Sequence, residues 1–177
     1  VPFLATSFEQ ARKLWEATRP AVERKLASQG LMVLFAVPWA PQGIYVDKPL
    51  QTVDDMKGLK WRAYNVGTAK IGEAVGAQAV TIQAAELPQA LATGVVNSFM
   101  SSGGTGCGAK VWERGWQLWQ EKAGWYLEQL KAKGMKVEPP SPALAEGFRK
   151  IGDQLTEEWL AKAGADGRAV IDSYRKM

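Results

Sequence analysis

Apolar positions along the chain change from helical spacing at the start to short unbroken runs in the middle. Residues 7–29 carry apolar side chains near a period of 3.6, open with a Ser7/Gln10 capping box and stop at Gly30, which predicts a helix. Pro20 should kink this helix or split it in two. Residues 31–37 are apolar throughout and rich in strand formers, which predicts a buried strand.

The middle of the chain alternates short strands with short helices. After a small strand at 44–46 and a single turn at 53–57, the pattern predicts strands at 59–64, 79–82 and 95–100, separated by helices at 66–75 and 84–93. This βαβαβ order with short links implies a parallel sheet with right-handed crossovers. Ligands of such sheets bind beyond the carboxyl ends of the strands, here after Tyr64, Ile82 and Met100.

The last third is predicted to be mainly helical. A glycine-rich loop at 101–108 leads into a helix over 110–133, an edge strand at 135–138 and a helix over 141–162. A turn at 164–166 separates the last helix, which carries Val170, Ile171 and Tyr174. In the 110–133 helix, Trp112, Trp116 and Trp119 would share one face, typical of core packing or of an oligomer interface.

Composition narrows the function more by what is missing than by what is present. The chain has 177 residues, no histidine and one cysteine, Cys107, which excludes histidine-based triads, histidine metal ligands and an intrachain disulfide. The net charge is +4, but the 22 basic residues are spread along the sequence, so we expect no nucleic-acid partner. No apolar run is long enough to span a bilayer.

Three segments carry candidate chemistry. Arg62, in the strand at 59–64, has a guanidinium that matches a ligand carboxylate, although an internal ion pair or an exposed edge would also explain it. In and directly after the 101–108 segment, Gly104, Gly106 and Ala109 fit a phosphate-binding glycine pattern, but a hydroxyl- and amide-rich ligand loop is favoured. Trp39 lies in a proline-flanked loop, where it could line a pocket.

Three motifs in order resemble the TRAP-transporter solute-binding proteins of the DctP family. Residues 54–62 read DDMKGLKWR, residues 75–80 read VGAQAV, and residues 86–96 read ELPQALATGVV. The resemblance implies a periplasmic-binding-protein-like (type II) α/β fold with a parallel-rich sheet, a βαβαβ core and C-terminal helices. It also implies that two lobes close over an organic acid whose carboxylate Arg62 clamps. No bond is made or broken, so we expect neither catalysis nor a cofactor nor a metal.

The resemblance places further ligand-binding residues and indicates the ligand class. Many family members have Asn at the position of Ser101, and several have a second Arg near the position of Gln42. With that arginine replaced, we expect a monocarboxylate with an apolar or aromatic body rather than a small dicarboxylate. The candidate ligand-binding residues are Arg62, Trp39, Gln42, Asn65, Phe99, Ser101 and Ser102.

The resemblance covers only the later part of the family's length. We expect an incomplete two-lobe architecture, with residues 36–108 as the ligand-binding lobe and residues 1–35 and 109–177 as helical, hinge or other-lobe elements. Most of an N-terminal lobe and a segment near Glu113 and Arg114 are expected to be missing. The predicted carrier is periplasmic, does not itself span the membrane and delivers its ligand to integral-membrane TRAP permease subunits. The alternative is a nucleotide- or phosphate-binding enzyme that uses Gly103 to Gly108.

Overall fold

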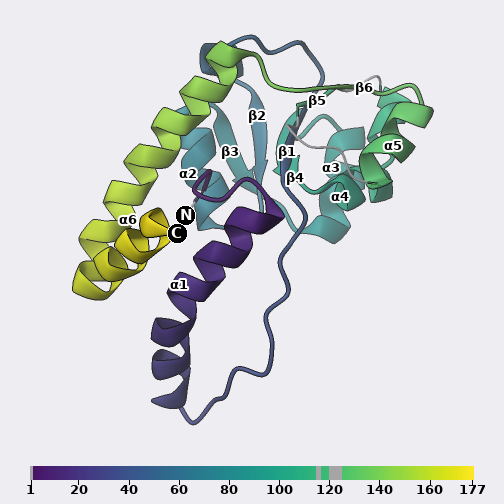
Figure 1. Ribbon diagram of the computed structural model, residues 1–177. Coiled ribbons are helices and arrows are strands. Elements are labelled where there is room, and N and C mark those ends of the chain that lie inside the picture. Colours follow the sequence, from purple (N-terminus) through teal and green to yellow (C-terminus); the bar gives the residue numbers. More distant parts are fainter. Residues whose placement is uncertain (1, 115–116, 120–124) are drawn as a thin grey trace. The chain divides into compact units, whose positions relative to one another are not determined.

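The computed structural model describes residues 2–114, 117–119 and 125–177 (Figure 1). The chain divides into two compact units. Unit 1 comprises Val1–Trp39 and Gly152–Met177, and unit 2 comprises Ala40–Ile151. Unit 2 contains the sheet and the motifs discussed above, so all of the strand-borne candidate residues lie within one compact body.

Unit 2 is built on a mixed, largely parallel sheet with the order β3-β2-β4-β1-β5-β6. Strand β2 runs parallel to both β3 and β4, whereas β1 is antiparallel to β4 and to β5. Strand β6 pairs with β5 at the edge, as the sequence predicted for this segment. The strands are β1 Gly43–Val46, β2 Lys60–Ala63, β3 Gln78–Thr81, β4 Ser98–Ser101, β5 Gln117–Trp119 and β6 Lys136–Glu138.

The predicted βαβαβ unit is confirmed. Helix α2, Val66–Ala74, links β2 to β3, and a 3-10 turn at Ala84–Glu86 followed by helix α3, Leu87–Ala92, links β3 to β4. Helix α2 packs closely on the sheet because Gly72 faces Trp61. A Cβ at position 72 would lie 2.7 Å from Trp61 Cδ1, so this contact requires glycine.

The main core lies on the other face of the sheet. Tyr45 of β1 and Phe99 of β4 are paired in register, and their rings stack with centroids 4.5 Å apart and planes 6° apart. Both side chains are fully buried. Around them the core gathers apolar residues from the sheet and the following helices: Ile82, Leu87, Ala90, Leu91, Val96, Ala109, Val111, Leu127, Leu130 and Met135.

The glycine-rich segment after β4 is not the loop that the sequence predicted. It forms a short helix, α4 Gly103–Gly108. Gly106 packs directly on Tyr45, since a Cβ there would lie 2.5 Å from the Tyr45 hydroxyl oxygen and 2.6 Å from Cε1. Close packing of a helix on an aromatic core residue therefore accounts for this glycine.

The single helix predicted over 110–133 is also wrong. The described part of this region contains a 3-10 turn at Val111–Arg114, strand β5 and helix α5, Trp125–Ala132. Pairing with β1 and β6 gives residues 117–119 sheet hydrogen bonds that outweigh the helical spacing of the tryptophans. The predicted tryptophan face is lost because Trp119 is in a strand, and Trp116 lies outside the described residues.

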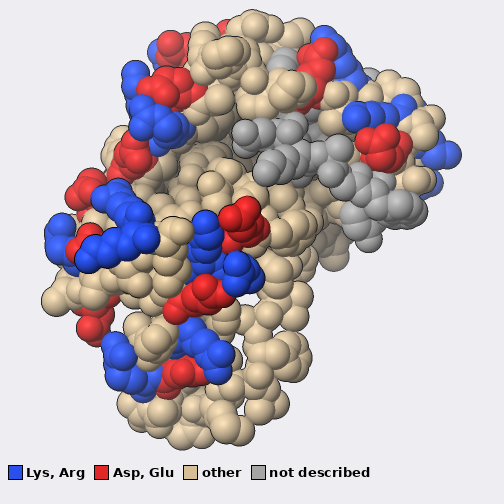
Figure 2. Space-filling model, viewed as in Figure 1, with Lys and Arg blue, Asp and Glu red and all other residues tan. Residues whose placement is uncertain are grey.

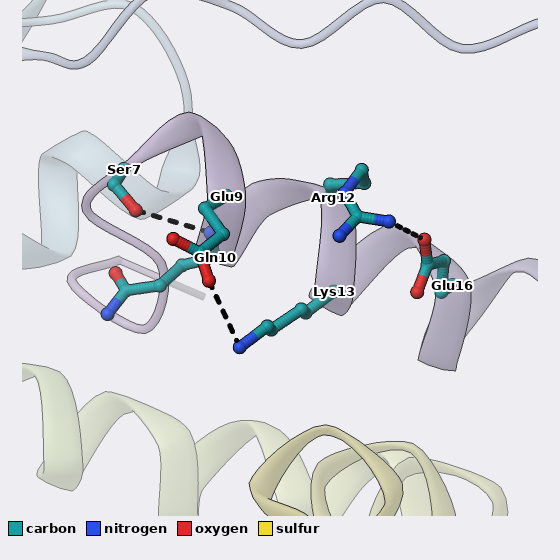
Figure 3. A network of polar contacts seen from close by, with 6 residues as sticks. All are labelled: Ser7, Glu9, Gln10, Arg12, Lys13 and Glu16. Atoms are coloured by element: carbon teal, nitrogen blue, oxygen red, sulfur yellow. Dashed lines mark hydrogen bonds and ion pairs between the residues drawn. The ribbon is translucent and has the colours of Figure 1, made fainter. Parts of the chain in front are cut away.

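Unit 1 contains helix α1, Phe8–Ala27, and the C-terminal part of helix α6, Pro142–Lys176. Ser7 caps α1 as predicted, its Oγ accepting from the backbone N–H of Gln10 at 3.2 Å (Figure 3). The Gln10 side chain accepts from the backbone N–H of Thr6 rather than completing the capping box. Exposed ion pairs Glu9–Lys13 and Arg12–Glu16 follow one turn later (Figure 3). Such pairs contribute only about 0.3–0.5 kcal/mol each. Helix α1 runs uninterrupted through Pro20, so the predicted split is wrong.

Two further predictions in unit 1 have opposite outcomes. Helix α6 breaks at Gly164, which has φ 65° and ψ −147°, as the predicted turn requires. The buried strand predicted at residues 31–37 is wrong, because this segment has no regular structure and Met32, Leu34 and Phe35 are each more than three-quarters exposed. An apolar run becomes a strand only when another strand pairs with it, and none among the described residues does so.

Charged residues are dispersed rather than segregated. Figure 2 shows Lys and Arg interspersed with Asp and Glu over α1 and α6 on the face in view. None of the helices in the described part of the chain has the length and apolar character needed to cross a bilayer.

Candidate functional site

The carboxyl ends of β2 and β4 meet at one edge of the sheet, and the amino end of β1 joins them there. Arg62 pairs in register with Phe99, and Gly43 pairs with Ser101. Residues that are directly opposite on neighbouring strands project to the same face, and residues two apart on a strand do so as well. Arg62, Tyr64 and Ser101 therefore share one face at this edge, next to Gln42.

Arg62 is the most buried charged side chain of the described residues, with 2% of its surface exposed. Its Nε–H donates to the carbonyl oxygen of Ile82, at 2.7 Å, and its guanidinium carbon lies 5.0 Å from the centre of the Tyr64 ring. Burial lowers the pKa of Arg62, and the nearby Tyr64 works in the opposite direction. An arginine nevertheless stays charged at any physiological pH.

Among the described residues, Arg62 has no acidic side chain as a partner. Within residues 2–114, 117–119 and 125–177, no carboxylate forms an ion pair with it, and neither terminal nitrogen has a hydrogen-bond acceptor. A buried charge without a counter-ion is costly, and native proteins rarely keep one. The internal ion pair considered from the sequence is thus wrong within this part of the chain, and the guanidinium keeps its bidentate face for another group.

Tyr64 and Gln42 form the rim beside this arginine. The Tyr64 hydroxyl donates to Oε1 of Gln42 at 3.4 Å, and Nε2 of Gln42 donates to the carbonyl oxygen of Ala40 at 2.9 Å. Tyr64 is half-buried, and burial raises the pKa of its hydroxyl, partly offset by Arg62. Tyr64 was not among the predicted ligand-binding residues, although alternation along the strand at 59–64 would have placed it on the face of Arg62.

Two serines add hydrogen-bonding capacity at the same edge. Ser101 ends β4 with 7% of its surface exposed, and Ser102 precedes α4 with 9% exposed. In the described ranges no hydrogen bond to either side-chain hydroxyl is formed, and Ser102 contributes only its carbonyl oxygen, which accepts from the Tyr45 hydroxyl at 3.2 Å. Buried hydroxyls usually have partners, so these two indicate a polar group that completes the site.

The three other candidates lie in different environments. Asn65 caps helix α2, its Oδ1 accepting from the Thr68 backbone N–H at 2.9 Å, which leaves its amide nitrogen for other contacts. Phe99 has no exposed surface and packs in the core against Tyr45. Trp39 is the last residue of the first segment of unit 1 and is 85% exposed. Only Asn65 among these three lies beside β2 in sequence, directly after Tyr64.

Other kinds of chemistry, including the nucleotide alternative, find little support in the geometry of the described residues. Burial raises the pKa of the Cys107 thiol, which disfavours the nucleophilic thiolate. Among the described residues, no group of three or more acidic or cysteine side chains is placed to hold a metal ion. The glycine pattern of the nucleotide alternative is explained at Gly106 by its contact with Tyr45.

Comparisons with known proteins identify the family and the fold of this chain. The family model for bacterial extracellular solute-binding protein family 7, DctP, matches residues 1–113. A search of curated protein sequences gave no match. The fold is that of the TRAP periplasmic solute-binding proteins, seen in many solved structures that align with nearly the whole chain.

Three of these structures are close enough in sequence to compare individually. DctP6 of Bordetella pertussis, an extracytoplasmic solute receptor binding pyroglutamic acid, is 42% identical with a TM-score of 0.94, over 99% of this chain and 73% of that chain. A marine metagenome TRAP solute-binding protein specific for pyroglutamate is 37% identical, with a TM-score of 0.90 over 99% and 72%. DctP7 of Bordetella pertussis, also a pyroglutamic acid receptor, is 32% identical, with a TM-score of 0.88 over 99% and 73%.

Proposed function

We propose, because this chain belongs to bacterial extracellular solute-binding protein family 7, the DctP family of TRAP-type receptors, that it captures a small organic acid for uptake. The capture takes place outside the cytoplasmic membrane, and the acid is then passed to integral-membrane TRAP permease subunits. Binding and release are the whole task. The protein holds its ligand by charge and hydrogen bonds and performs no reaction on it.

The observation that carries this proposal is the guanidinium of Arg62, which pairs with no acid among the described residues. It is almost fully buried, anchored through Nε alone, and has no internal acid within the described residues. A ligand carboxylate would accept two parallel hydrogen bonds from the terminal nitrogens and supply the missing negative charge. The buried hydroxyls of Ser101 and Ser102 would add neutral hydrogen bonds at the same edge.

We further propose that the ligand is a cyclic monocarboxylate of the pyroglutamate class. Three relatives that are 32–42% identical to this chain bind pyroglutamate. Among the described residues the site contains one arginine, Arg62, and Gln42 lies near the position where several family members have a second one, so a single carboxylate would satisfy the site. The neutral rim of Tyr64 and Gln42 suits the uncharged ring of such an acid better than a second carboxylate.

The test is to titrate the purified protein with pyroglutamate, followed by calorimetry, and to compare Arg62→Met with the wild type. Two charge-assisted bonds of about 1.5–3 kcal/mol each predict a loss of about 100-fold or more. Arg149→Met is the matched control, since Arg149 is also in unit 2 but is exposed and paired with Glu146. It removes the same charge and should leave the affinity unchanged.

A second measurement separates loss of the ligand contact from loss of the fold. Without ligand, Arg62 is a buried charge with no counter-ion among the described residues, so its replacement by methionine should not lower the thermal unfolding temperature. Wild-type affinity in Arg62→Met, or an equal loss in Arg149→Met, would refute the assignment of Arg62 as the carboxylate anchor.

A further inference from the structure

The hydrogen-bond direction along Gln42 and Tyr64 is determined by chemistry. The carbonyl oxygen of Ala40 can only accept, so the Gln42 atom 2.9 Å away from it is the amide nitrogen. The other end of the amide, facing Tyr64, is therefore the oxygen Oε1. Because an amide oxygen cannot donate, the Tyr64 hydroxyl must donate its hydrogen across the 3.4 Å contact.

This arrangement determines which hydrogen-bonding groups Tyr64 and Gln42 still offer to a ligand. Tyr64 has used its only hydrogen, so its oxygen remains as an acceptor. Gln42 has used one N–H of Nε2 on Ala40, so the second N–H remains as a donor. The rim beside Arg62 therefore presents one acceptor and one donor on neighbouring side chains. Within the described residues, no further hydrogen bond occupies either group.

A lactam ring has the complementary pattern. Its amide is held cis by the ring, so its N–H donor and C=O acceptor lie side by side on one edge. A carboxylate has two acceptors and a hydrocarbon ring has neither group, so both fit this rim less well. We propose that Tyr64 Oη and Gln42 Nε2 recognise the amide edge of a lactam acid while Arg62 holds its carboxylate. This role rests on the proposed function.

The position of Tyr64 supports a recognition role. Its backbone N–H donates to Thr68 Oγ1 at 3.0 Å, which ties the end of β2 to the first turn of α2. Its ring packs against the Arg62 guanidinium, 5.0 Å from ring centre to guanidinium carbon. Burial also keeps the hydroxyl protonated at neutral pH, so the hydrogen that orients Gln42 is retained. The acceptor on Tyr64 is thus held in a defined place relative to the charge anchor.

The experiment uses three five-membered-ring acids that differ at one edge. Pyroglutamate has the N–H and the C=O, its lactone analogue 5-oxotetrahydrofuran-2-carboxylate keeps the C=O alone, and cyclopentanecarboxylate has neither. The wild-type protein should bind pyroglutamate at least about 10-fold more tightly than the lactone. The reason is that the ring oxygen of the lactone, an acceptor, would face the acceptor oxygen of Tyr64.

Two variants then assign the two groups. Tyr64→Phe keeps the ring over Arg62 and should weaken pyroglutamate about 10-fold, while the affinity for cyclopentanecarboxylate changes less than about 2-fold. Gln42→Met should weaken both the lactam and the lactone and leave cyclopentanecarboxylate unchanged. Thermal unfolding of each variant without ligand confirms that it is folded.

The outcomes distinguish this role from the proposed function on which it rests. Equal weakening of all three acids by Tyr64→Phe, or no change in any, would overturn the amide-edge role and leave the Arg62 site intact. A wild-type protein that binds the lactone as tightly as pyroglutamate would also overturn it. If none of the acids binds the wild type, the proposed function fails, and this role fails with it.

Discussion

Replacing Gly106 by alanine tests the close packing of helix α4 on the core. The new Cβ would lie 2.5–2.7 Å from three atoms of the Tyr45 side chain, well inside the normal contact distance. Tyr45 cannot easily move away, because it is fully buried, stacked on Phe99 and hydrogen-bonded through its hydroxyl to the Ser102 carbonyl. The substitution should therefore destabilise unit 2, because Tyr45 cannot move to make room for the new methyl group.

The magnitude follows from two opposing effects. Overpacking of a well-filled core costs about 1–3 kcal/mol. Alanine in place of glycine within a helix returns about 0.5–1 kcal/mol through lower backbone entropy in the unfolded chain. The expected net loss for Gly106→Ala is roughly 0–2.5 kcal/mol of the free energy of unfolding, with a central value of about 1 kcal/mol.

The same helix supplies the control. A Cβ at Gly108 would meet no atom within 4 Å, so Gly108→Ala should be neutral or stabilising by up to about 1 kcal/mol. Urea unfolding followed by circular dichroism compares the two variants with the wild type at one pH. If Gly106→Ala unfolds at the same or a higher urea concentration than Gly108→Ala, the argument that packing requires this glycine is refuted.

Two further predictions concern polar groups in unit 2. Burial raises the pKa of Tyr45 above its usual 10.0, so the stability it contributes is complete below pH 10 and is lost as the pH rises further. The free energy of unfolding of the wild type should exceed that of Tyr45→Phe by about 0.5–1.5 kcal/mol at pH 7. Above pH 10 this difference should shrink by up to about 1.4 kcal/mol per pH unit. A difference that stays constant with pH would contradict the burial argument. Thr68→Val removes the buried oxygen that accepts from the Tyr64 and Asn65 backbone N–H groups, and should cost about 1–3 kcal/mol in urea unfolding. Thr68→Ser keeps the oxygen and should lose much less; equal losses would point to packing instead.

The βαβαβ order was predictable because glycines mark its boundaries. Gly58, Gly76 and Gly94 have φ values of 72°, 70° and 68°, which other residues rarely adopt, and each lies where the pattern changes between strand and helix. These signals are local. Together with the periodicity of apolar residues, these glycines therefore identify the elements between them from the sequence alone.

The wrong predictions depend on contacts between distant segments. Residues 117–119 form a strand because they pair with β1 and β6, although their tryptophan spacing fits a helix. Residues 31–37 have the composition of a strand but no pairing partner among the described residues. In both cases the outcome depends on neighbours that local composition does not encode.

The site was predictable in part. The position of Arg62 in a predicted strand and the family resemblance selected it, and its burial without an acidic partner among the described residues fits that choice. Its orientation was not predictable, because it depends on the carbonyl of Ile82 at the end of a neighbouring strand. The same holds for the contact between Tyr64 and Gln42, which are 22 positions apart in sequence and meet only when the sheet forms.

The anchoring of Arg62 to a main-chain carbonyl has a consequence for how such receptors diversify. The atom that fixes the cation belongs to the backbone, so substitutions around it leave the charge in place. Gln42 and Tyr64, by contrast, determine the rim through their side chains and can change one at a time. If Arg62 holds the ligand carboxylate as we propose, a scaffold of this kind can acquire new ligands by point mutation at the rim while the carboxylate anchor is inherited unchanged.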